Sequence, residues 1–125
     1  MNVWNGFKLA PSTIIKINTC GETIDFLYDT GSQVTIMTRN GFESLPNKPP
    51  IQKVERSGTA VDGTPFKFDG VAYLNLSLPN ERNGQYALEY ETILISCNVE
   101  SNIYGAQTEE KFRECERDIE RSTLS

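Results

Sequence analysis

The segment with the clearest chemical potential is Tyr28 to Ser32, in which Asp29 is followed by Thr30 and Gly31. The aspartate ends an apolar alternating segment, and the glycine lets the backbone turn sharply and lets another segment approach closely. A carboxylate held in such a turn can act as a general acid or base. A surface turn in which Asp29 only caps its own backbone is the competing interpretation. The apolar segments on both sides favour the chemical role.

Histidine is absent from the sequence. Its absence excludes Ser-His-Asp triads, Cys-His dyads and histidine-rich metal sites. The three cysteines, Cys20, Cys97 and Cys115, are an odd set without metal-ligand spacing, so we expect free thiols and neither a metal nor a cofactor. Any hydrolytic chemistry therefore rests on carboxylates.

The composition indicates one globular, strand-rich domain of 125 residues, with 38% apolar and 10% aromatic residues. A net charge of -5 without any cluster of Lys or Arg argues against nucleic-acid binding. No apolar run approaches the roughly 20 residues that cross a bilayer, and no basic and apolar leader stands at the N-terminus. We therefore expect a soluble, intracellular protein without membrane contact.

The elements that must position Asp29 follow from the apolar periodicity and the turn residues. Period-2 alternation marks the strand that ends at Asp29 and a long strand in which Ala72, Leu74, Leu76 and Leu78 share one face. The expected elements are strands over 12–18 and 23–28 forming a hairpin, a strand over 34–37, a loop over 41–50, a hairpin over 53–60 and 64–68, strands over 72–78 and 86–96, and a charged amphipathic helix from 108.

Three segments in this order resemble the retropepsins, the single-domain aspartic proteases of retroviruses and long-terminal-repeat retrotransposons, and most of all the gypsy-like retrotransposon enzymes. F-L-Y-D-T-G-S-Q-V-T-I-M is similar to the catalytic turn and the strand after it. T-A-V-D-G-T-P-F-K-F-D-G-V-A-Y-L-N-L is similar to the flap hairpin. S-N-I-Y-G-A-Q-T-E-E-K-F resembles the apolar-apolar-glycine segment that leads into a short helix. The resemblance covers most of residues 8–112.

The resemblance implies an all-β, retropepsin-like β-barrel with a flap hairpin and a short C-terminal helix, pairing as a two-fold dimer. It divides the chain into a protease domain over 1–107 and a charged helical segment over 108–125. Family members usually end in a strand that pairs in the dimer. No clear strand follows Phe112, so we expect the dimer interface to be built differently, with the charged helix as one candidate.

The resemblance also implies roles for the residues of the turn. Asp29 would be the catalytic acid, and Thr30 would brace the paired turns by hydrogen bonds across the dimer. Gly31 would let the two turns meet, and Ser32 would donate a hydrogen bond to the catalytic carboxylate from outside. The remaining implied site residues are the flap tip that closes over the peptide, Val61, Asp62, Gly63 and Thr64, and the support behind the turn, Ile103, Tyr104 and Gly105.

Peptide hydrolysis by paired carboxylates needs one ionised and one protonated aspartate. The D-T-G triplet occurs once in this chain, so a two-fold homodimer would have to supply the second Asp29. The implied substrate is an extended peptide within a retroelement Gag-Pol polyprotein, cleaved in the cytoplasm or inside virus-like particles. A cellular protease of the same family and a catalytically silent dimerisation or peptide-binding module on the same fold stay open as alternatives.

Overall fold

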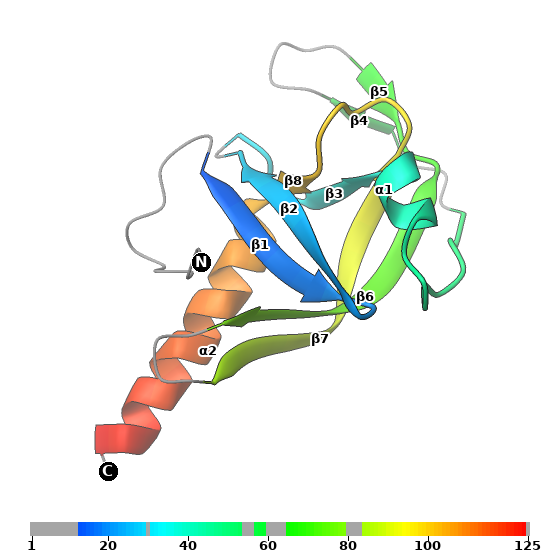
Figure 1. The fold of residues 1–125 in the computed structure, drawn as a ribbon. Coiled ribbons are helices and arrows are strands. Elements are labelled where there is room, and N and C mark those ends of the chain that lie inside the picture. Colours follow the sequence, from blue (N-terminus) through cyan, green and yellow to red (C-terminus); the bar gives the residue numbers. More distant parts are fainter. Residues whose placement is uncertain (1–12, 30, 54–56, 60–64, 80–83, 125) are drawn as a thin grey trace.

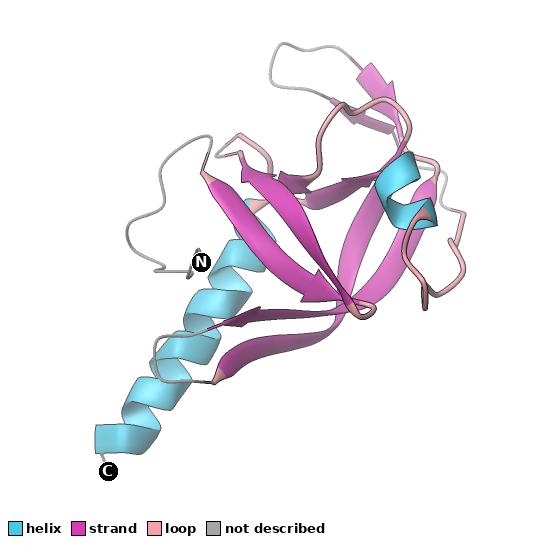
Figure 2. Ribbon diagram, viewed as in Figure 1, coloured by secondary structure: helices cyan, strands magenta, loops and turns pink. Residues whose placement is uncertain are grey.

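A closed six-stranded barrel forms the body of the molecule, and one long helix lies against it (Figures 1 and 2). The computed structural model describes residues 13–29, 31–53, 57–59, 65–79 and 84–124. The elements are β1 (Ile14–Thr19), β2 (Glu22–Tyr28), β3 (Thr35–Thr38), α1 (Arg39–Glu43), β4 (Ser57–Thr59), β5 (Pro65–Lys67), β6 (Gly70–Pro79), β7 (Gln85–Ser96), β8 (Ile103–Tyr104) and α2 (Ala106–Leu124).

The strand order around the barrel is β1-β2-β8-β3-β7-β6. The short β8 is inserted between β2, to which it runs parallel, and β3, to which it runs antiparallel. The Asn18–Ser77 pair between β1 and β6 closes the barrel. Strands β4 and β5 pair as a separate antiparallel hairpin, which stands away from the barrel (Figure 1). The two strands that flank the D-T-G turn are therefore joined through β8 and not to each other.

The barrel interior is filled by one face of each long strand, as period-2 alternation requires. On β6 the expected residues Ala72, Leu74, Leu76 and Leu78 are all buried, whereas Tyr73 is 42% exposed. Helix α2 packs against β7 and β3 and contributes the fully buried Phe112. The first turns of α2 thus belong to the same core as the barrel.

A smaller apolar cluster lies apart from the main core. Ile36, Val71 and Leu94 are its buried members. Four partly buried residues pack against it, namely Val34, Phe68, Val99 and Ile103. Because β3 is buried on both faces, its residues serve the main core and this second cluster in alternation.

Most of the expected elements are confirmed, including both hairpins and the strands over 34–37, 72–78 and 86–96, with shifts of a few residues. The expected loop over 41–50 is partly wrong, because α1 occupies its start. The Thr38 side chain caps α1 by accepting a hydrogen bond from the Gly41 amide at 2.9 Å, and Phe42 anchors the helix in the core.

Helix α2 begins at Ala106, slightly before the expected start, and continues to Leu124. Its C-terminal end projects beyond the barrel (Figure 1). Within the described part of the chain, no helix is both long and apolar enough to cross a membrane.

Candidate active site

Asp29 lies immediately after β2, in a tight turn closed by its own backbone and side chain. The Ser32 amide donates to the Asp29 carbonyl at 3.1 Å, and the Gly31 amide donates to the Asp29 carboxylate at 2.9 Å. The Asp29 amide in turn donates to the Tyr104 carbonyl at 3.3 Å. The carboxylate is therefore oriented by the glycine of the D-T-G triplet, and the backbone of the turn is fastened to β8.

The Ser32 hydroxyl does not donate to the carboxylate, contrary to the expected role of this residue. It donates to the Val34 carbonyl at 2.7 Å. A hydroxyl has one proton to donate, and the turn places a backbone carbonyl within its reach. In this chain the outer support of the Asp29 carboxylate is the Gly31 amide.

Residues Ile103 to Gly105 lie directly behind the turn. In β8, Ile103 and Tyr104 stand in register with Leu27 and Tyr28 of β2. Ile103 also faces Ile36 of β3. The sequence-predicted support segment and the sequence-predicted acid therefore lie side by side, although more than seventy positions separate them in the chain.

Gly105 makes the closest approach between this support and the turn. A Cβ atom on Gly105 would lie 2.2 Å from the Val34 carbonyl oxygen and 2.3 Å from the Val34 carbonyl carbon. Backbone on both sides leaves no flexible atom that could move aside. Position 105 therefore requires glycine, because any side chain would collide with the Val34 backbone. The close approach lets α2 begin against the segment that follows the D-T-G turn.

Tyr104 anchors the support segment in the core. Its ring is fully buried, meets the Tyr28 ring edge-on at 5.9 Å between centroids and stacks on Phe112 at 6.5 Å. Burial raises the pKa of Tyr104 above its ordinary value, and the charge of the nearby Glu109 carboxylate raises it further. The aromatic contacts connect the residue next to Asp29 with helix α2.

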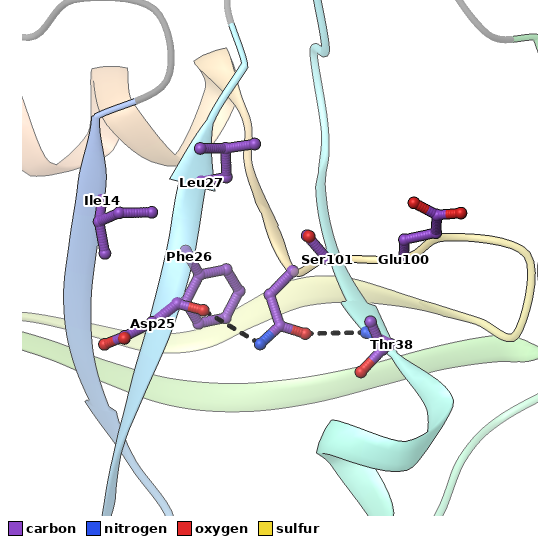
Figure 3. A pocket seen from close by; sticks show the side chains of 8 residues that line it. Ile14, Asp25, Phe26, Leu27, Thr38, Glu100 and Ser101 are labelled. Atoms are coloured by element: carbon purple, nitrogen blue, oxygen red, sulfur yellow. Dashed lines mark hydrogen bonds between the residues drawn. The ribbon is translucent and has the colours of Figure 1, made fainter.

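Asn102 fastens β2 to β3 at the start of the support segment, and sequence reasoning did not identify it. Its side-chain oxygen accepts from the Thr38 amide at 2.9 Å, and its side-chain nitrogen donates to the Asp25 carbonyl at 3.1 Å (Figure 3). The amide lies beside a hollow of about 280 Å³. No local pattern marks such a residue, because both partners are distant in sequence.

The hairpin that is expected to form the flap is described only in its strands, β4 and β5, and near its base. Val61, Asp62, Gly63 and Thr64 lie outside the described residues, and so does Thr30 of the turn. Before β4, Gln52 is joined to Val71 of β6 by a pair of backbone hydrogen bonds of 2.8 Å.

The titratable groups of the described residues form no cluster of three or more His, Cys, Asp or Glu that could hold a metal ion. All three cysteines are free. What the described site offers for chemistry is one oriented carboxylate in a turn supported by β8 and α2.

Comparison with known proteins gives a structural match and a short sequence match. No family model matches the sequence. The structure is similar to EIAV protease complexed with the inhibitor HBY-793, with a TM-score of 0.50 and 15% sequence identity over 94% of each chain. The chain has the retroviral protease fold. This likeness bears out the mainly-β fold with a C-terminal helix that the sequence predicts.

The sequence match is to an uncharacterized protein of Caenorhabditis elegans, K02A2.6. It is 28% identical over 72 residues, which are 58% of this chain. The matched region spans only 6% of the length of that protein.

Proposed function

We propose that the protein is an aspartic endopeptidase whose catalytic dyad consists of Asp29 from each of two identical chains. The observation that carries the proposal is the position of Asp29 on a retroviral protease fold. Its carboxylate is held by the Gly31 amide, in a turn between β2 and β3 that β8 supports from behind. The single D-T-G triplet per chain supports the pairing.

In the proposed reaction the two carboxylates, about 3 Å apart, share one proton because both cannot be ionised together. The ionised Asp29 takes a proton from a water molecule, which attacks the scissile carbonyl carbon. The protonated Asp29 donates its hydrogen to the carbonyl oxygen. The Asp29 that gained the water proton then donates it to the leaving nitrogen, and the C–N bond breaks. A hydroxyl of the tetrahedral intermediate returns its proton to the other Asp29, which restores a dyad with one proton.

The substrate that fits this proposal is an extended peptide covered by the β4–β5 hairpin. The second apolar cluster supports a preference for apolar side chains, because it includes partly buried Val34, just before β3, and Ile103 in β8. The resemblance of three segments to the retrotransposon enzymes supports a retroelement polyprotein as the natural substrate. The cytoplasm, or a virus-like particle within it, is the corresponding place of action.

The test is peptide cleavage by wild-type protein and by D29N at mildly acidic pH, with products identified by mass spectrometry. D29N should reduce the cleavage rate by at least about 10²-fold, because the substitution removes the group that accepts and donates the proton and changes little else. D25N is the matched control, since Asp25 is an exposed carboxylate on β2 whose partner is Lys16 at 2.9 Å. Near-wild-type cleavage by folded D29N, or loss of cleavage in D25N alone, would refute the proposal.

A further inference from the structure

A pair of buried hydroxyl groups joins β3 to helix α2 behind the candidate catalytic turn. Thr35 and Thr108 are each 1% exposed. The Thr35 hydroxyl donates to the Thr108 hydroxyl at 2.6 Å and accepts a hydrogen bond from the Gly105 amide at 3.0 Å. Thr35 thus uses its one proton on Thr108 of α2 and a lone pair on Gly105 of the support segment.

This pair belongs to a larger set of contacts between residues 32–35 and residues 105–108. The Ala106 amide donates to the Ser32 carbonyl and the Gln107 amide to the Gln33 carbonyl, both at 2.9 Å. Together with the two bonds of the Thr35 hydroxyl, four hydrogen bonds connect the segments. Thr35 is the only side chain among the described residues that contributes both a donor and an acceptor to this set.

The hydroxyl of Thr35 is not needed to fill space. Valine has nearly the shape of threonine and would fill the same space. The next two residues of β3, Ile36 and Met37, are themselves buried and apolar. Valine would leave the buried Gly105 amide without its acceptor, and an unsatisfied buried donor is costly. The geometry therefore indicates that the hydroxyl fixes the relative position of two segments.

We propose that Thr35 is a positioning residue for catalysis, acting with Thr108 to hold the Asp29 turn at a fixed distance from β8 and α2. This inference rests on the proposed function, because positioning matters most when two copies of the turn must meet. Any displacement of the turn occurs in both chains and alters the spacing of the two carboxylates. A misplacement of about 1 Å can reduce a rate by about 10²-fold.

The variants that test this role are T35V, T35S, T108V and the double variant T35V/T108V. We expect T35V to lower kcat about 10-fold or more with KM within about 2-fold, because the turn is displaced while the peptide-binding surface is retained. T35S keeps a hydroxyl at this position, so its kcat should stay within about 3-fold of the wild-type value. The double variant should be no slower than T35V, because both substitutions break the same contact.

Two controls separate positioning from general loss of stability. T19V removes a buried threonine hydroxyl in β1, whose hydrogen-bond partner is the Cys20 sulfur at 3.8 Å. I17V weakens the barrel core in β1, near the hairpin end of the β1–β2 pair and away from β8 and α2. All variants are assayed where sedimentation and circular dichroism show folded dimer. A kcat of T35V equal to that of wild type, or lowered no more than in T19V and I17V, would overturn the inference.

If the wild-type protein cleaves no peptide, only the proposed function is refuted. Amide hydrogen exchange then tests the positioning role of Thr35 without any activity. The amides of Gly105, Ala106 and Gln107 should exchange about 10-fold faster or more in T35V and at the wild-type rate in T35S. The amides of Ile17 and Ile24 in the β1–β2 hairpin should not change. Equal exchange at Gly105 to Gln107 in wild type and T35V would overturn the positioning role.

Discussion

The Asp29 carboxylate is oriented by a backbone amide, that of Gly31, and not by a neighbouring hydroxyl. A backbone donor cannot rotate away as a side chain can, so the orientation of the carboxylate depends on the conformation of the turn. That conformation depends in turn on contacts made by residues 32–35 with the start of α2. At the scale of single residues, the support of the candidate acid is therefore largely backbone geometry.

Ser32 provides a test of this assignment. Because its hydroxyl donates to Val34, S32A should leave the acidic limb of the pH–rate profile in place and change kcat/KM by less than about 3-fold. The lost hydrogen bond should cost about 0.5–1.5 kcal/mol of unfolding free energy. Urea unfolding and a pH–rate profile measure both effects.

S44A is the control for this substitution, since the Ser44 hydroxyl makes the same kind of bond to the Gly41 carbonyl at 2.8 Å, remote from the turn. A clear displacement of the acidic limb in S32A, absent from S44A, would show that the Ser32 hydroxyl serves the carboxylate after all.

The sequence predicted where the turn of the candidate site lies better than it predicted the contacts of that turn. Asp29 and the glycine after it could be recognised because a turn between two strands leaves a local pattern. The predicted partner of the Ser32 hydroxyl, the Asp29 carboxylate, differs from the observed Val34 carbonyl, because the sequence does not show which nearby acceptor the turn brings to the hydroxyl. Asn102 and Thr35 leave no pattern at all, since their partners are brought close only by the fold.

At the scale of elements, the strand β8 decides how the turn is supported. It is only two residues long, yet it joins β2 and β3 and leads directly into α2. Its second residue, Tyr104, is buried with its hydroxyl near the Glu109 carboxylate, and both circumstances raise the pKa of Tyr104. The pairing of β2 with β8 should consequently depend on Tyr104 remaining protonated.

The raised pKa predicts a specific loss of stability in alkali. The unfolded chain releases this proton near the ordinary tyrosine value of 10.0, whereas the folded chain retains it to higher pH. The contribution of Tyr104 to the free energy of unfolding is therefore complete below about pH 10. It decreases as pH rises further, by up to about 1.4 kcal/mol per pH unit. Y104F should remove this dependence. Urea unfolding of wild type and Y104F between pH 8 and pH 11 measures it.

Y73F is the matched control, because Tyr73 is 42% exposed and lies on β6. It should keep the alkaline slope of the wild-type protein. Equal slopes in wild type and Y104F would show that Tyr104 does not cause the dependence.

The hairpins and long strands were predictable because period-2 alternation and turn residues such as Asp-Gly are local signals. Helix α1 was missed because its start depends on a cap from Thr38 and its position on burial of Phe42, within a stretch that glycine and proline otherwise mark as a loop. Strand β8 is too short to show a period. The family resemblance, and not periodicity, indicated residues 103–105.

At the scale of the whole molecule, the chain carries one oriented carboxylate on a fold shared with a retroviral protease. Helix α2 packs on the barrel through Phe112 and Thr108, and its exposed face carries charged residues such as Glu110 and Lys111. The surface that would pair two chains leaves no local signal in the sequence. Pairing of two chains is best tested through peptide cleavage, because the proposed dyad needs an Asp29 from each chain.

The most direct measurement is the activity of wild-type chains co-refolded with about a ninefold excess of D29N chains. Random pairing would leave about a tenth of the wild-type chains in pairs with two carboxylates, so activity per wild-type chain should fall to about a tenth. The same excess of D25N chains, which keep Asp29, should instead raise the activity per wild-type chain about tenfold, because every pair then carries two carboxylates. Activity per wild-type chain that is unchanged by excess D29N would contradict a dyad built from two chains.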